Sequence, residues 1–113
     1  MVGNGWSWWI KKVKANYMNK IFKYSLPVKE KLEIELPKNA LIIRVEDVDG
    51  LFYLWAIVSD TEDVETEVRY LEFYKTGQPI ETPLKDLVFI GTCKLFIMQE
   101  LCLYVFENTN PTK

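Results

Sequence analysis

The sequence has no histidine and only two cysteines among its 113 residues. The absence of histidine excludes Ser-His-Asp triads, histidine metal sites and imidazole acid–base catalysis near neutral pH. The two cysteines, Cys93 and Cys102, form no CxxC motif, and each lies in an apolar, strand-like run. We therefore predict two buried free thiols in preference to a disulfide or redox pair. We also predict no metal site, no cofactor and no enzymatic activity.

Long hydrophobic runs are missing as well, so the sequence predicts no membrane span. The first residues do not resemble a secretory signal, because their positive charges follow the apolar residues instead of preceding them. We therefore expect a cytoplasmic protein. A chain of 113 residues that is 49% hydrophobic can bury a core without disulfides or metals. No internal repeat or linker divides it, and the sequence predicts one domain.

The net charge of −2 is unevenly distributed along the chain. Residues 1–38 carry eight lysines against three glutamates, whereas residues 39–113 carry six bases against thirteen acids. Such an acidic body is expected to avoid nucleic-acid backbones. Residues 59–67 hold five carboxylates. A solvated loop is the favoured interpretation of this stretch; a calcium loop, which lacks the glycine of an EF-hand, and an acidic mimic of nucleic acid are the alternatives.

Residues 1–17 differ from the rest of the chain and allow two interpretations. Apolar residues at helical spacing, with lysines elsewhere, are compatible with a short amphipathic helix at a membrane surface or groove; they are Trp6, Trp9, Ile10, Val13 and Tyr17. Alternatively, codons for Lys-Lys-Val-Lys can contain a ribosome-binding sequence shortly before Met18. We expect translation to start at Met18, which changes the net charge to −5 because three lysines are lost.

Residues 41–60 predict two strands joined by a tight turn at Asp49-Gly50, because Asp-Gly tolerates the positive φ of a type I′ turn. Counting outwards pairs Val48 with Leu51, Val45 with Leu54, Ile43 with Ala56 and Leu41 with Val58, a set expected to form one apolar face. The opposite face is expected to carry Ile42, Arg44, Glu46, Tyr53, Trp55 and Ile57. Arg44 would lie directly opposite Trp55 and stack on its indole.

The remaining body also has strand-like patterns separated by turn residues. Alternating or apolar runs predict strands at residues 20–26, 31–36, 68–74, 88–96 and 101–106, with a helical turn near 84–87 and a bulge at Gly91. The closing pair is expected to connect near Met98-Gln99-Glu100. About seven strands predict an all-β fold, either a small antiparallel sandwich or a partly closed barrel, over residues 18–108, followed by a polar tail at 109–113.

From Met18 onwards the chain resembles a family of short uncharacterised proteins encoded by bacteriophages and prophages. The matching features are Tyr24 and Pro27, Leu36-Pro37-Lys38-Asn39-Ala40, Leu54-Trp55-Ala56-Ile57-Val58, Thr76-Gly77-Gln78-Pro79-Ile80, Ile90-Gly91-Thr92 and Val105-Phe106-Glu107. The family pattern usually has histidine at the positions of Gln78 and Tyr104, so an activity that needs those histidines is not expected here. The resemblance implies a phage origin and supplies no mechanism.

Two binding functions follow from these patterns. The first is a non-enzymatic accessory protein that binds and blocks a host protein, with anti-defence as one role, through an aromatic face at Arg44, Tyr53 and Trp55. The second is capture of a small nucleotide signal, with Trp55, Tyr70 and Tyr74 stacking on a base and Lys75 and Thr76 meeting its phosphate; Gln78 is a further candidate binding residue. A minor virion or assembly component is a further alternative, and the sequence is compatible with a homodimer.

Overall fold

The computed structural model describes residues 18–60 and 64–111, which form an all-β fold with one 3-10 helix, η1 (Leu84–Asp86). Its seven strands are β1 (Asn19–Leu26), β2 (Lys31–Pro37), β3 (Leu41–Val48), β4 (Leu51–Ser59), β5 (Thr66–Lys75), β6 (Leu87–Ile97) and β7 (Gln99–Asn108). The number of strands and the fold class are as predicted. The amphipathic helix considered for residues 1–17 lies outside the described residues. Nothing helical in the described part of the chain is long and apolar enough to cross a bilayer.

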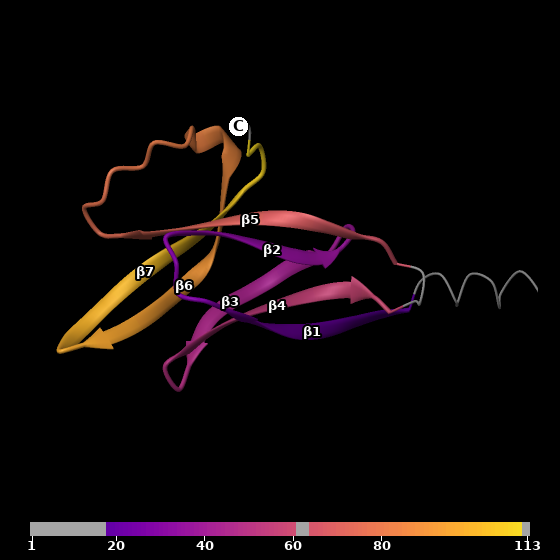
Figure 1. Ribbon diagram of the computed structural model, residues 1–113, viewed down its shortest axis with the longest axis horizontal. Helices are drawn as coiled ribbons and strands as arrows, with labels where there is room; N and C mark the ends of the chain where they lie inside the picture. The colour runs from indigo at the N-terminus through magenta and orange to yellow at the C-terminus, as the bar shows by residue number, and fades with distance from the viewer. Residues whose placement is uncertain (1–17, 61–63, 112–113) are drawn as a thin grey trace, which may run out of the picture.

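The strands form two antiparallel sheets (Figure 1). One sheet has three strands in the order β1-β4-β3, and the other has four in the order β2-β5-β7-β6. The edge strands β3 and β6 approach each other on one side, where the backbone N–H of Lys94 donates to Asp47 Oδ1 over 2.7 Å. The other two edges, β1 and β2, are not paired with each other. The fold is therefore a sandwich joined along one side, and no closed barrel forms.

The core lies between the two sheets and follows the alternation of side chains along the strands. In β4, Phe52, Leu54, Ala56 and Val58 are buried, while the residues between them point away from the core. Leu32 and Leu36 of β2 are buried in the same way, as the sequence pattern predicted. The ring of Phe52 stacks on that of Phe73 from the other sheet, with centroids 6.1 Å apart. Each such buried side chain stabilises the fold by about 1.5–3 kcal/mol.

The turn between β3 and β4 is at Asp49-Gly50, as predicted, and both residues have positive φ (53° and 83°). Val48 pairs with Leu51, Val45 with Leu54, and Arg44 with Trp55, also as predicted. Beyond Arg44 the predicted register is wrong, because a bulge at Ile43 shifts the pairing. Ile42 therefore pairs with Ala56, and Leu41 pairs with Ile57.

The bulge and the strand alternation also correct the predicted faces of this hairpin. Val48 and Leu51 were expected on the buried face with Val45 and Leu54, but they lie on the opposite, exposed face together with Leu41. Ile42, expected on the outer face, packs against the core instead. The physical reason is that successive side chains along a strand point to opposite faces. Val48 and Val45 are three residues apart, so the Val48–Leu51 pair and the Val45–Leu54 pair lie on opposite faces.

Gly91 lies where the two sheets meet, and the predicted bulge is present as a register shift between Phe89 and Gly91. A Cβ atom at Gly91 would lie 2.4 Å from the carbonyl oxygen of Val45. Only glycine allows β6 to approach β3 this closely, and its φ of 153° is one that other residues rarely adopt.

Both cysteines are free, as predicted, with Cys93 fully buried and Cys102 half-buried. Cys93 pairs with Leu103 and Cys102 pairs with Lys94, so the two thiols point to opposite faces of the β6–β7 hairpin. Burial, together with the nearby carboxylates of Asp47 and Glu46, raises the pKa of Cys93 to about 12. The thiol of Cys93 is therefore protonated and unreactive at neutral pH.

Candidate functional site

The outward side of the three-stranded sheet, here called the open face, carries apolar and aromatic side chains that no described segment covers. Ile21, Leu41 and Leu51 are each about 60% exposed. Large apolar side chains gathered on one uncovered sheet surface are typical of a contact surface for another molecule. The open face consists of Ile21 and Lys23 of β1, Leu41, Ile43, Arg44, Glu46 and Val48 of β3, and Leu51, Tyr53, Trp55 and Ile57 of β4.

Two cations lie on the aromatic rings at the centre of this face. The Arg44 guanidinium is 4.3 Å from the centroid of the Trp55 ring, as expected from their cross-strand pairing. The Lys23 ammonium is 4.4 Å from the centroid of Tyr53. The Tyr53 and Trp55 rings are themselves 6.1 Å apart, so the two stacks form one cluster. Such stacks hold long cationic side chains in place and contribute about 0.5–1 kcal/mol each at exposed sites.

Arg44 is oriented further by Glu46, two residues along β3. Its Nε donates a hydrogen bond of 2.6 Å to Glu46 Oε1, and the two side chains also form an ion pair. Lys23 forms no ion pair with any residue in the ranges 18–60 and 64–111. The open face therefore presents one neutralised cation and one cation available to a partner, both beside aromatic rings.

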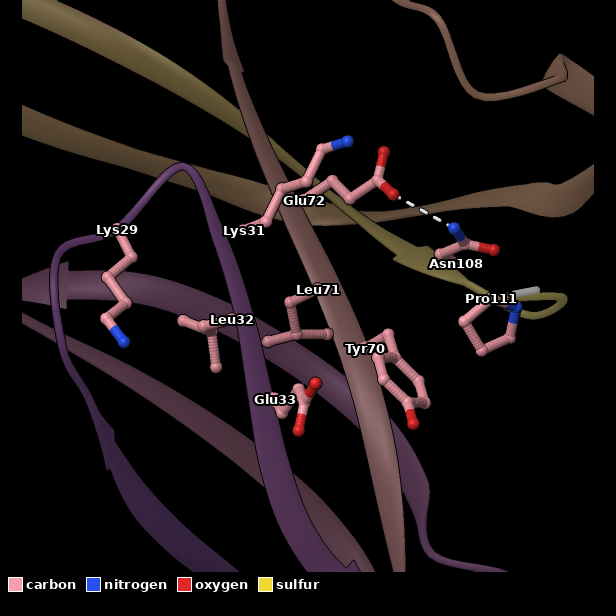
Figure 2. A pocket seen from close by; sticks show the side chains of 9 residues that line it. All are labelled: Lys29, Lys31, Leu32, Glu33, Tyr70, Leu71, Glu72, Asn108 and Pro111. Atoms are coloured by element: carbon pink, nitrogen blue, oxygen red, sulfur yellow. Dashed lines mark hydrogen bonds between the residues drawn. The ribbon is translucent and has the colours of Figure 1, made fainter. Parts of the chain in front are cut away.

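The outward side of the four-stranded sheet carries a second candidate, which we call the Lys31 groove. Three hollows of about 630, 400 and 310 Å³ share Lys31 as a lining residue. The largest lies on β2 and β5, and Tyr70, Lys29, Glu33 and Asn108 contribute to its walls (Figure 2). Lys31 extends toward Glu72, whereas Lys29 points away from it (Figure 2). Cationic, acidic, aromatic and amide groups thus surround a space large enough for a small ligand.

Glu72 is the buried anchor of this groove, with only 4% of its surface exposed. It accepts hydrogen bonds from the hydroxyls of Tyr74 (2.5 Å) and Thr82 (2.8 Å) and from the Asn108 amide (2.9 Å). Burial alone would raise the pKa of Glu72, but the three donors and the charge of Lys31 lower it below its ordinary value. The ionised carboxylate therefore ties the β5–β6 loop and the end of β7 to the sheet.

The residues predicted as a site fall into two groups on opposite sides of the sandwich. Arg44, Tyr53 and Trp55 come together on the open face. Tyr70, Tyr74 and Gln78 line the Lys31 groove. Leu71 and Phe73, which alternate with Tyr70 and Tyr74, face the core, so the core separates these tyrosines from Trp55. The structure does not bring Trp55, Tyr70 and Tyr74 into one stacking pocket.

The predicted phosphate residues have a local structural role. The backbone N–H of Lys75 donates to Gln78 Oε1 over 3.0 Å, and the N–H of Gln78 donates to the Lys75 carbonyl over 3.1 Å. These bonds close the turn after β5, and Thr76 is exposed on it. Lys75 lines a further hollow together with Leu95 and Leu101, and this hollow adjoins the Lys31 groove because Gln78 and Glu30 line both.

Several residues of the two surfaces were not among the predicted site residues. Lys23 had a usable signal, because the alternation of residues 20–26 already placed it on the outward side of its strand. Lys31 also alternates outward, but nothing local in the sequence indicates that three hollows meet at its side chain. Asn108 and Glu72 are 36 residues apart, and only the folded chain shows that they bond.

Comparison with known proteins identifies a family without assigning an activity. Neither the curated proteins nor the solved structures contain a match to the chain. Residues 18–113, which include both surfaces described above, match the family described as Domain of unknown function (DUF7352), and the chain belongs to this family.

Proposed function

We propose that this protein is a non-enzymatic binding module that recognises another protein through its open face. The observation that carries the proposal is the arrangement of exposed aliphatic residues around the Arg44–Trp55 and Lys23–Tyr53 stacks. Tryptophan, tyrosine and arginine are the residue types that dominate binding energy at protein interfaces. Here Tyr53 and Trp55 are half-buried on the central strand, Arg44 is exposed on the Trp55 ring, and Ile21, Leu41 and Leu51 surround them.

The chemistry of the open face indicates what kind of partner surface would fit. Its aliphatic margin matches an apolar surface, and Lys23 and Arg44 match carboxylates placed near the centre. Lys23 forms no ion pair with any of the described residues, so a partner carboxylate would give it its first ion pair. A partner that lacks such a group would leave Lys23 desolvated without compensation.

The biological setting of the proposal comes from the sequence resemblance to phage and prophage proteins. We propose a phage accessory protein that acts in the cytoplasm of the host bacterium by blocking a host protein, with anti-defence as the specific role. The absence of histidine from the chain supports binding over catalysis, because the commonest general acid–base group is missing.

The test is affinity capture from bacterial lysate with matched variants. We expect the wild-type protein to retain a specific host protein that the double variant Leu41→Ser, Leu51→Ser and the single variant Trp55→Ala do not retain. Leu84→Ser is the control, because Leu84 is 74% exposed on η1 and lies outside the open face. Equal retention by all variants, or no host protein above a blank matrix, would contradict the proposal.

A second candidate function is supported by the Lys31 groove. Tyr70, Lys29 and Lys31 lie around its largest hollow, which suits a small anionic molecule with an aromatic ring, such as a nucleotide. A thermal-shift screen against mononucleotides and cyclic nucleotides tests this function. Binding predicts a rise in Tm that Lys31→Ala and Tyr70→Ala abolish and Leu84→Ser preserves. No shift with any nucleotide would exclude it.

A further inference from the structure

The tip of the β6–β7 hairpin is a projecting apolar knob. It carries three consecutive large apolar residues, and Phe96, Ile97 and Met98 are 70%, 61% and fully exposed. In Figure 1 this tip stands clear of the other strands at the lower left. Met98 has a φ of 70°, a left-handed backbone conformation that costs about 1 kcal/mol for a residue other than glycine. The hairpin thus holds a flexible apolar side chain fully in solvent at an energetic cost.

An apolar hollow of about 200 Å³ lies beside the same hairpin, near its tip. Its apolar lining consists of Val28, Phe73, Leu95, Leu101 and Leu103. A dry protein cavity of about 150 Å³ is large enough to hold benzene. The hollow therefore has the volume and the lining needed to take one phenylalanine or methionine side chain.

We propose that this hollow receives the hairpin tip of a second copy of the same chain. Leu95 and Leu101, which line the hollow, are each three residues from Met98, so the tip lies roughly 10 Å beyond the hollow. Two hairpins lying antiparallel about a twofold axis then place each tip at the hollow of the other copy. The contact is isologous and closes on itself, which limits the assembly to a dimer.

Charged side chains of both signs lie at the two ends of the contact. Lys94 and Glu100 pair with each other just before the tip, with their Nζ and Oε2 atoms 3.3 Å apart, so the tip carries no unbalanced charge into the contact. Lys29, Glu30 and Lys75 border the hollow. A rim with both signs and a neutral tip oppose the contact with no large repulsion between like charges.

A second copy suits the hollow better than an unrelated ligand, because every molecule that has the hollow also has a side chain of the right size beside it. Burying Met98 removes exposed apolar surface that is otherwise a liability in solution. The contact uses residues separate from the open face, so the dimer would present two open faces to partners.

The test is the oligomeric state by sedimentation equilibrium between about 1 µM and 1 mM, the range in which weak to moderate complexes dissociate. We expect a monomer–dimer equilibrium for the wild-type chain. The tip variant Met98→Ser and the hollow variant Val28→Glu should each raise the dissociation constant by about 10- to 100-fold, whereas Phe96→Ser, on the face of the hairpin opposite Leu95, should leave it unchanged. Val28 is 55% exposed, so all three substitutions are compatible with folding, which circular dichroism verifies.

A mixing experiment separates the proposed contact from any general effect of polar substitution. Met98→Ser retains an intact hollow and Val28→Glu retains an intact tip, so an equimolar mixture restores one of the two contacts and should associate more strongly than either variant alone. Leu84→Ser is the matched control and should dimerise like the wild type. A monomer over the whole range, open-ended polymers, or a dimer that all variants retain would each overturn the proposal.

Discussion

The guanidinium of Arg69 on β5 binds the carboxylate of Glu107 on β7 through two hydrogen bonds, Nε–Oε2 at 2.5 Å and Nη2–Oε1 at 3.0 Å. A third bond, from Arg69 Nη1 to the carbonyl of Ala40, reaches the start of β3 over 2.8 Å. The Arg69 and Glu107 side chains are only 17% and 13% exposed. The hydrogen bonds that Arg69 donates to Glu107 outweigh the desolvation of the guanidinium and raise the pKa of Arg69. One side chain thus links the four-stranded sheet internally and to the other sheet.

Replacing Arg69 by methionine should lower the free energy of unfolding by about 3 kcal/mol, because it leaves the Glu107 carboxylate without its partner in a largely buried place. Urea denaturation at neutral pH measures the change. The control is Lys38→Met, which removes the exposed ion pair between Lys38 and Glu65 and should cost within about 0.5 kcal/mol. Equal midpoints for the two variants would show that the Arg69–Glu107 pair does not stabilise the fold.

Replacing Gly91 by alanine should cost more than about 3 kcal/mol, because its Cβ would overlap the Val45 carbonyl and force β6 away from β3. The matched control is Gly77→Ala, since Gly77 also has positive φ (88°) but no atom within 4 Å of the new Cβ. That substitution should cost only about 1 kcal/mol of backbone strain. Chemical denaturation of both variants under the same conditions decides the comparison, and a smaller loss for Gly91→Ala would mean that the sheets separate easily.

Glu72 should make the stability of the fold depend on pH in the acid range. Its pKa in the folded protein lies below the ordinary value of 4.5, so it stabilises the fold above that value and loses the contribution as the pH falls through the folded pKa. At neutral pH, Glu72→Gln should therefore be less stable than the wild type by about 1–3 kcal/mol. The difference should shrink steadily below pH 4.5, as followed by urea unfolding. A constant difference would show that Glu72 acts through shape and not through its charge.

The two thiols should differ in their reactivity in the folded protein. Cys93 is fully buried and its pKa is raised to about 12 by that burial, whereas Cys102 is half-buried. A colorimetric thiol reagent at mildly alkaline pH should label at most one thiol in the native protein and both in urea. Cys102→Ser should abolish native labelling, and Cys93→Ser should preserve it. Rapid labelling of Cys93 would indicate that the β6–β7 hairpin opens readily.

Arg44→Ala should show whether the Arg44–Trp55 stack serves the stability of the fold or the binding of a partner. The stack and the ion pair with Glu46 are both about half-exposed, so their removal should change the free energy of unfolding by less than about 1 kcal/mol. If the open face binds a partner, the same variant should lose most of the retained host protein in affinity capture. A large loss of stability with unchanged capture would assign the stack to the fold instead of to binding.

The sequence allowed the hairpin around Asp49-Gly50 and all seven strands to be predicted, because turn chemistry and alternation act over a few residues. The predicted register beyond Arg44 was wrong because the bulge at Ile43 contains no glycine or proline that would indicate it in the sequence. Ile43 and Gly91 line one hollow between β3 and β6, so the bulge lies at a contact between segments far apart in the sequence.

The candidate site was predictable only in part, for the same reason. The Arg44–Trp55 pair follows from local register and was found. The choice of which aromatics share a pocket depends on how the sheets are ordered, and Tyr70 and Trp55 belong to different sheets. The buried partners of Glu72 and the hollow beside Leu95 arise from segments far apart in the chain, so pattern reasoning cannot find them.

The order of the strands has a consequence for synthesis on the ribosome. β1 pairs only with β4, and β2 pairs only with β5, whereas β3–β4 and β6–β7 are hairpins between neighbouring segments. The first two strands to emerge therefore have no partner until residues 51–59 and 66–75 have been made. During that interval the nascent chain carries two unpaired strands, and closing their long loops makes folding slower than for a chain of consecutive hairpins. Both unpaired strands carry charged side chains, which oppose aggregation before their partners are made. These are Lys20 and Lys23 in β1 and the alternating Lys31, Glu33 and Glu35 in β2.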